Sequence, residues 1–216
     1  ADKNGYAQGA FNVNAVCQVK AAVDVHQILR SPAIIQGADL ANGFMGGRTD
    51  FANSTLEDKK AGAKNIGAAV KKYAADSDIP VALHLDHGKN FDSCIAAIEG
   101  GYTSVMIDGS SLPFDENVEL TREVVKYAHE RGVTVEGELG VLAGVEDHVF
   151  AATSTYTNPL SAIDFFKKTG VDALAISYGT MHGANKGKNA VIRKEIAIAI
   201  KECMLHEGIE GYIVSH

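Results

Sequence analysis

Cysteine is scarce in this chain: its three residues, Cys17, Cys94 and Cys203, lie far apart in the sequence. An odd number of widely spaced cysteines does not make a disulfide framework, so we expect reduced thiols in a reducing compartment. No apolar run is long enough for a membrane-spanning helix, and the N-terminal residues lack the pattern of a signal peptide. These absences predict a soluble cytoplasmic protein with no membrane partner.

Positive charge is also in short supply. The chain has 20 Lys and Arg residues against 27 Asp and Glu, which gives a formal net charge of −7. Nucleic-acid binding depends on clustered Lys and Arg, so we expect no nucleic-acid partner. An anionic small molecule remains compatible, because local cations and helix N-termini bind anions inside an acidic protein. A hydrophobic content of 46% over 216 residues is enough for one substantial core.

Short apolar segments alternate along the chain with longer amphipathic ones. We predict strands at residues 7–13, 33–36, 81–87, 103–108, 133–139, 171–177 and 212–216. We predict helices at residues 16–29, 56–75, 91–100, 115–131, 159–169 and 192–207. Two segments show neither the helical nor the strand periodicity of apolar residues, and we interpret both as loops. They are residues 37–55, which are rich in Gly and Asn, and residues 140–158.

Strands that alternate with helices of these lengths form parallel βαβ units. The fold class predicted is therefore α/β, as a (β/α)8 TIM barrel of which about seven of the eight strands are present. We expect residues 1–216 to form a single barrel domain that is truncated before the eighth βα unit, since a complete barrel typically needs about 250 residues.

Three histidines stand where an apolar, strand-like run gives way to a loop. They are His87 in VALHLDHG, His182 in DALAISYGTMHG and His216 in GYIVSH. A parallel α/β barrel gathers the carboxyl ends of its strands around one mouth, so residues this far apart in sequence can meet there. Three neutral imidazoles bind Zn²⁺ and leave one coordination position for substrate. The sequence therefore predicts a metal enzyme.

Carboxylates follow the same pattern. Asp108 and Glu138 end predicted strands, where each could accept a ring N–H from a metal-bound histidine. Asp86 adjoins His87, and strand alternation gives the two opposite faces, so both reach the mouth only if the strand ends or bulges there. Glu146 lies in a Gly-containing segment that could close over a site and supply a base. Helix caps, ion pairs and a solvated acidic loop are the alternatives.

The stretch GTMHGANKGK offers backbone N–H groups and cations beside His182, which suits a phosphate, although it is neither a P-loop nor a dinucleotide fingerprint. The sixth predicted strand contains no lysine, so it offers no Schiff-base nucleophile. His84 is open between a structural role and the orientation of a neighbouring residue.

In combination, these segments resemble the class II, metal-dependent fructose-bisphosphate aldolases and their tagatose-bisphosphate relatives. The matching segments are GAFNVN, SPAIIQ, PVALHLDHG, TSVMIDGSSLPFDENVELT, GVTVEGELGVLAGVED, TGVDALAISYGTMHG and IVSH. The resemblance implies a (β/α)8 barrel that reversibly cleaves a ketose 1,6-bisphosphate, fructose first, into dihydroxyacetone phosphate and glyceraldehyde 3-phosphate. It also implies a homodimer or higher homo-oligomer.

The resemblance assigns roles residue by residue. His87, His182 and His216 match the zinc ligands, Asp86 matches the acid/base at the substrate hydroxyl, and Glu146 matches the base that exchanges the proton of dihydroxyacetone phosphate. The remaining matches are Asp108 and Glu138 around the metal or at a second metal position, Asn14 and Gln36 near the substrate, and Gly183 and Lys186 at the phosphate and a monovalent cation (Na⁺ or K⁺). Two positions depart from the family pattern: Ala38 replaces a small hydroxyl residue and Asn185 replaces an aromatic one.

Three other interpretations stay open beside a fructose-bisphosphate aldolase. A metal-dependent hydrolase would use zinc-bound water, but it is expected to have a His-x-His in the first strand, and GAFNVN has none. A non-catalytic metal- or sugar-phosphate-binding barrel, or an inactive fragment, is favoured by the missing eighth strand. Tagatose bisphosphate is the alternative substrate. It differs from fructose bisphosphate at one carbinol centre, so the geometry of the pocket, and not the sequence pattern, distinguishes the two sugars.

Overall fold

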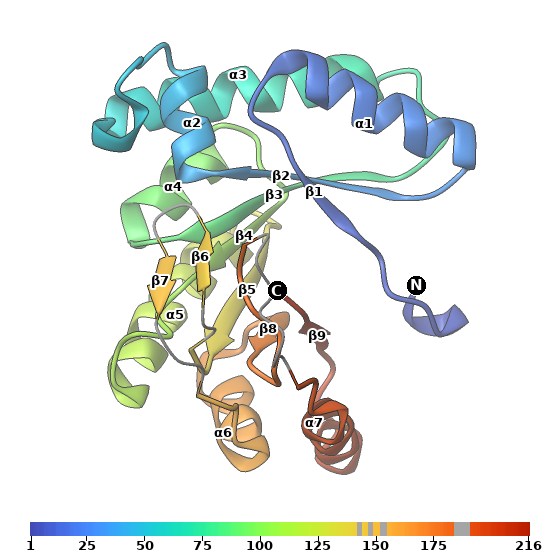
Figure 1. The fold of residues 1–216 in the computed structure, drawn as a ribbon, viewed down its shortest axis with the longest axis vertical. Helices are drawn as coiled ribbons and strands as arrows, with labels where there is room; N and C mark the ends of the chain where they lie inside the picture. The colour runs from blue at the N-terminus through green and yellow to red at the C-terminus, as the bar shows by residue number, and fades with distance from the viewer. Residues whose placement is uncertain (142–143, 147–148, 152–154, 184–190) are drawn as a thin grey trace. The chain divides into compact units, whose positions relative to one another are not determined.

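The computed structural model describes residues 1–141, 144–146, 149–151, 155–183 and 191–216 (Figure 1). The chain divides into two compact units, Ala1–Met106 and Ile107–His216. None of the helices in the described ranges is long and apolar enough to cross a lipid bilayer.

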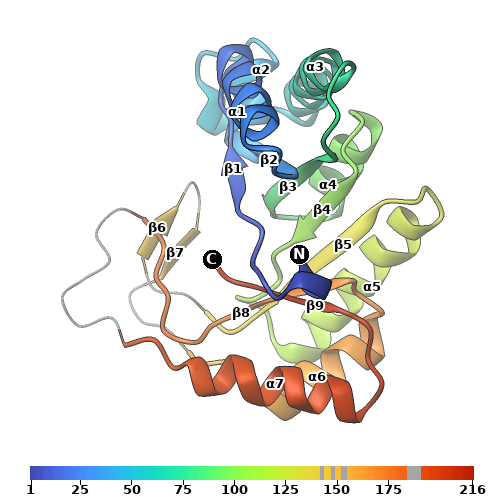
Figure 2. The ribbon, with the colours of Figure 1, turned by 90° about the vertical axis from the view of Figure 1, so that its right-hand side faces the viewer.

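The first unit is built on parallel strands that follow one another in chain order. Strand β1 pairs with β2 and β2 with β3, in a register that places Gln36 beside Asn12 on one side and His84 on the other. Helices α1 and α3 lie side by side along these strands in both views (Figures 1 and 2). The elements are η1 (Asp2–Asn4), β1 (Ala10–Asn12), α1 (Val16–Leu29), β2 (Ala33–Ala38), α2 (Asp39–Met45), η2 (Phe51–Asn53), α3 (Leu56–Ala74), β3 (Val81–Gly88) and α4 (Phe91–Glu99), with the boundary between the units inside β4 (Ser104–Ile107).

Local signals fix the helix ends of this unit. The Thr55 hydroxyl accepts a hydrogen bond from the backbone N–H of Asp58, whose carboxylate accepts the backbone N–H of Thr55 at 2.9 Å. This capping box satisfies two of the N–H groups that have no partner within the helix, and α3 begins where the sequence predicts it. Helix α1 ends with Arg30 in the left-handed region (φ 52°).

The prediction of one long loop over residues 37–55 was wrong, because α2 and η2 form there. Glycines in this segment and in the helix that follows it serve close packing. A Cβ on Gly62 of α3 would lie 1.6 Å from the carbonyl oxygen of Asn42, and one on Gly46 would lie 2.0 Å from that of Asp58. Helices α2 and α3 therefore touch backbone to backbone, which only glycine allows at these positions.

The second unit repeats the parallel arrangement. Strand β5 pairs with β8 and β8 with β9, so that Glu138 lies beside Ala175 and Ala175 beside Val214. Helices α6 and α7 lie next to each other in both views (Figures 1 and 2). The elements are α5 (Phe114–His129), β5 (Thr134–Leu139), β6 (Gly144–Glu146), β7 (Val149–Ala151), α6 (Pro159–Thr169), β8 (Ala173–Ile176), α7 (Lys194–His206) and β9 (Tyr212–Val214).

The interpretation of residues 140–158 as a loop was wrong in part. Strands β6 and β7 form a short antiparallel hairpin within it, with Val145 opposite Phe150. Each strand has three residues, too few for strand alternation to be visible in the sequence.

Parallel strands that alternate with helices confirm the α/β class. Buried apolar side chains, Ile35 and Leu85 in the first unit and Phe165 and Leu174 in the second, form the core of each unit. The closed (β/α)8 barrel and its single domain stay predictions.

Candidate functional site

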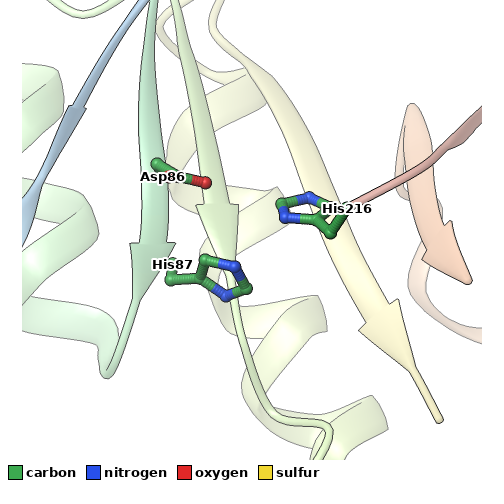
Figure 3. A group of neighbouring side chains, drawn as sticks. All are labelled: Asp86, His87 and His216. Atoms are coloured by element: carbon green, nitrogen blue, oxygen red, sulfur yellow. The ribbon is translucent and has the colours of Figure 1, made fainter. Parts of the chain in front are cut away.

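The carboxyl end of β3 positions two of the predicted residues. Asp86 and His87 are both buried, and the His87 backbone leaves the extended conformation with a φ of 48°. This positive φ breaks the strand alternation that assigned the two side chains to opposite faces. Figure 3 shows both extending in the same direction from β3, and a carboxylate oxygen of Asp86 lies within 4.8 Å of a ring nitrogen of His87. A left-handed non-glycine residue costs about 1–3 kcal/mol, and such strain gathers at functional sites.

The two oxygens of the Asp86 carboxylate differ in their hydrogen bonding to the described residues. Asn12, at the end of β1, donates from Nδ2 to Asp86 Oδ2 at 2.8 Å. The other oxygen, Oδ1, is buried and has no hydrogen-bond partner among the described residues. A buried carboxylate oxygen left in this state costs free energy unless a proton, a cation or a ligand hydroxyl reaches it. The arrangement suits a group that holds or moves a proton.

Asn12 was not predicted as a site residue, whereas Asn14, two residues later, was. Asn14 is exposed, and its backbone N–H donates to Gln18 Oε1 at 2.6 Å. The register gives a signal that could have identified Asn12, because it is the last residue of β1 and pairs with Gln36. Gln36, predicted near the substrate, is buried in β2.

His84 has a structural contact. Its Nδ1 lies 2.8 Å from Ser104 Oγ at the start of β4. This hydrogen bond joins two strand segments of the first unit, and the orientation of a neighbouring residue by His84 stays a prediction.

The second unit brings two of the predicted metal ligands together. The rings of His182 and His216 have centroids 6.1 Å apart and planes inclined by 70°. Two imidazoles bound to one ion, each through a nitrogen about 2.0–2.1 Å from it, have centroids roughly 5–6 Å apart. The spacing of these two rings is thus compatible with two ligands of a single ion.

A buried carboxylate orients the His216 ring. His216 Nε2 lies 3.0 Å from Glu136 Oε1, and both side chains are largely buried. A ring N–H donated to a carboxylate fixes the tautomer, so Nδ1 carries the lone pair available to a metal. His216, labelled in Figure 3, follows β9, whereas Glu136 lies in β5. The same role for Asp108 and Glu138 stays a prediction, and Glu136 makes this contact with His216.

Asp108 and Glu138 form a second acidic group in the second unit. A carboxylate oxygen of Asp108 lies within 4.8 Å of one of Glu138, which is 1% exposed. Asp108 Oδ1 also accepts hydrogen bonds from Ser110, at 3.0 Å from N and 2.6 Å from Oγ. Two carboxylates this close favour a bound cation or a proton on one of them, because two negative charges repel each other.

Three remaining predicted residues are less fully described. Gly183 follows His182 with a positive φ of 81°, a conformation that glycine adopts readily. The backbone of Glu146, the last residue of β6, pairs with that of Val149 across the hairpin. Lys186 lies outside the described residues.

A family comparison decides what this set of residues belongs to. The model of the class II fructose-bisphosphate aldolases matches residues 1–216. The chain is a member of this family. Class II aldolases depend on a metal ion, in agreement with the imidazole pair and the buried carboxylates.

Individual relatives support the family assignment. The chain is 50% identical over 188 residues to a fructose-bisphosphate aldolase of Treponema pallidum, covering 85% of this chain and 53% of that protein. It is 40% identical over 198 residues to one of Staphylococcus aureus, covering 91% of this chain and 64% of that protein. The solved structure of the YdjI aldolase of Escherichia coli K12 is 27% identical with a TM-score of 0.75, over 99% of this chain and 68% of that one. The chain thus spans about half the length of the Treponema pallidum protein and somewhat under two thirds of the Staphylococcus aureus protein.

Proposed function

We propose that this chain carries the metal ligands and proton-transfer groups of a zinc-dependent aldolase. The reaction is the reversible aldol cleavage of a ketose 1,6-bisphosphate, fructose first, to dihydroxyacetone phosphate and glyceraldehyde 3-phosphate. The observation that carries the proposal is the His182–His216 ring pair, backed by Glu136, in a member of the class II family.

His87, His182 and His216 are the residues that would hold the ion. Neutral imidazoles are preferred zinc ligands, and three of them leave a coordination position for substrate, as catalytic zinc requires. Bound there, the metal supplies Lewis-acid polarisation of the substrate ketone. Half-buried Asp108 and buried Glu138 offer a second, all-oxygen position that a cation can occupy.

Proton transfer falls to two carboxylates. Asp86, oriented by Asn12, would hold the proton released from the substrate hydroxyl when the carbon–carbon bond breaks, through its unpartnered Oδ1. Glu146 would move the proton at the carbon next to the ketone. Its place at the end of a short hairpin supports this role, because a hairpin can close over substrate as a unit.

The wider properties follow from family membership and belong to the proposal. We propose a complete (β/α)8 barrel, a homodimer or higher homo-oligomer, and a cytoplasmic location. Asn14 and Gln36 would lie near the substrate, and Gly183 and Lys186 would serve the substrate phosphate and a monovalent cation. The aldehyde-lyase activity would act in glycolysis and gluconeogenesis.

A metal-dependent cleavage assay tests the proposal. Protein stripped with a chelator is assayed on fructose and tagatose bisphosphates, before and after Zn²⁺ is restored, and triose phosphate release is measured. Activity that vanishes with the metal and returns with zinc supports the proposal, and the ratio of the two rates identifies the substrate. Cleavage that persists without metal contradicts it. Tight metal binding with no cleavage of either sugar indicates a non-catalytic binding barrel.

A further inference from the structure

An ion pair in the first unit, between half-buried Lys59 and buried Asp39, lies next to the strand end that carries Asp86 and His87. Asp39, the first residue of α2, is 3% exposed and accepts hydrogen bonds at Oδ2 from Lys59 Nζ at 2.7 Å and from Ser93 Oγ at 2.8 Å. These three residues belong to α2, α3 and α4, so one carboxylate oxygen joins three helices. The residue before Asp39, Ala38, pairs with Asp86 in the parallel register.

Ser93 links this carboxylate to the turn that follows His87. Its backbone N–H donates to Asn90 Oδ1 at 2.9 Å, which caps α4, while its hydroxyl donates to Asp39. The turn has little room to shift, because a Cβ on Gly88 would lie 2.5 Å from the carbonyl oxygen of Met106. The segment from His87 to Ser93 is therefore held at its far end by Asp39.

The His87 backbone explains why such an anchor is needed. Its φ of 48° is strained for a side chain other than glycine, and a strained conformation persists only where the surrounding structure determines it. On the N-terminal side, Asn12 holds Asp86 through the 2.8 Å hydrogen bond. On the C-terminal side, the anchor runs from Asn90 through Ser93 to Asp39.

The ion pair is also poorly suited to a purely stabilising role. Asp39 Oδ1 is buried without a hydrogen-bond partner among the described residues, although Oδ2 has two. Buried ion pairs often give no net stability over an apolar replacement, and an unsatisfied oxygen makes the balance worse. A geometric role accounts for a charged group kept in this place.

We propose that Asp39 is a positioning residue for His87: through Ser93 it holds the β3–α4 turn in the conformation that lets His87 bind metal. The inference rests on the proposed function, in which His87 is a ligand. It concerns the direction and the rigidity of the ligand, because the hydrogen bonds of Asp39 run to Lys59 and Ser93.

Two substitutions test the anchor at different points. Ser93→Ala removes the hydroxyl and leaves the Asp39–Lys59 ion pair in place, so it keeps the test valid if Asp39→Asn does not fold. Ile66→Val, in the α3 core, is the matched control for a general loss of stability. Zn²⁺ affinity is measured by competition with a chromophoric chelator, and amide hydrogen exchange over residues 86–93 is measured on the metal-free chain.

We expect Ser93→Ala and Asp39→Asn to weaken zinc binding about 10–100-fold, as removal of a partner that orients a ligand does. Exchange over residues 86–93 should be faster in both, and Ile66→Val should change neither quantity. Folded variants that bind zinc within about twofold of the parent would overturn the inference. A parent chain that binds no zinc would contradict the proposed function. In that case the anchor is judged by amide hydrogen exchange alone, and unchanged exchange over residues 86–93 in the variants would exclude Asp39 as the anchor of the turn.

Discussion

His216 and Glu136 are 80 residues apart in the sequence, yet Nε2 of the imidazole lies 3.0 Å from Oε1 of the carboxylate. Glu136 lies in β5, whereas His216 follows β9. The contact therefore joins the first and the last of the three neighbouring parallel strands β5, β8 and β9. A carboxylate in this position holds the imidazole in one tautomer and makes its other nitrogen a better electron donor.

Replacing that carboxylate tests its effect on the metal. We expect Glu136→Gln to weaken Zn²⁺ binding about 10–100-fold, because the amide keeps the shape but loses the charge that supports the imidazole. Chelator competition gives the dissociation constant. Glu130→Gln, on the exposed surface, should bind zinc like the parent. Equal affinity in Glu136→Gln and the parent would show that the hydrogen bond has no influence on the metal.

Zinc content should depend on His182. Removing one of three imidazoles leaves two ligands, too few for tight binding in a site that must also accept substrate, so we expect His182→Ala to lose most of its metal. Metal analysis of the purified protein by mass spectrometry measures the loss. His206→Ala changes an exposed helical histidine and should keep a full complement. Unchanged zinc in His182→Ala would remove this residue from the ligand set.

Elements with strong local signals could be predicted from the sequence, and side-chain partners could not. Helix α3 begins at Leu56 as expected, and α6 covers residues 159–169 as expected. Helix α2 was missed because Gly43 and Gly46 read as loop signals in the local sequence. These glycines pack closely against Ser54 and Asp58, which lie too far along the chain for a local pattern to show the contact.

The same limit applies to the site. The strand-end histidines were identified from position alone, because a strand end is visible in the sequence. Asn12 was not selected, because choosing it requires the register and knowledge of where β1 stops. The left-handed conformation of His87 is invisible to strand alternation, yet it sets the direction of the His87 side chain.

Asp86 should be required for catalysis and dispensable for metal binding. We expect Asp86→Ala to lower the cleavage rate by about 10²–10⁴, the usual contribution of a general acid or base, with zinc still bound. Steady-state kinetics and metal analysis on the same preparation separate the two effects. Asn12→Ala removes only the orienting hydrogen bond and should cause a smaller loss. Full activity in Asp86→Ala, or loss of its metal, would contradict the assignment.

The thiols should differ sharply in reactivity. Burial raises the pKa of Cys94 well above its ordinary value, and the nearby Asp39 carboxylate raises the pKa further, so the thiolate that reacts is not populated near neutral pH. Cys17 is exposed. With a thiol reagent at pH 8, peptide mass spectrometry should find Cys17 modified and Cys94 intact until the protein is denatured. Rapid labelling of Cys94 in the native chain would show that α4 opens readily.

Glu146 ends β6, which pairs with β7 in a short antiparallel hairpin. If the hairpin closes over substrate, its carboxylate reaches the carbon next to the polarised ketone and excludes water that would protonate that carbon. Glu146→Ala should then keep its zinc and its affinity for dihydroxyacetone phosphate. It should also exchange the substrate proton with deuterated solvent about 10²–10⁴ times more slowly, as loss of a general base does. The exchange is followed by NMR in a form of the protein that is active on this substrate. Glu130→Gln serves as the control for a lost surface charge, and exchange at the parent rate in Glu146→Ala would mean that another group removes the proton.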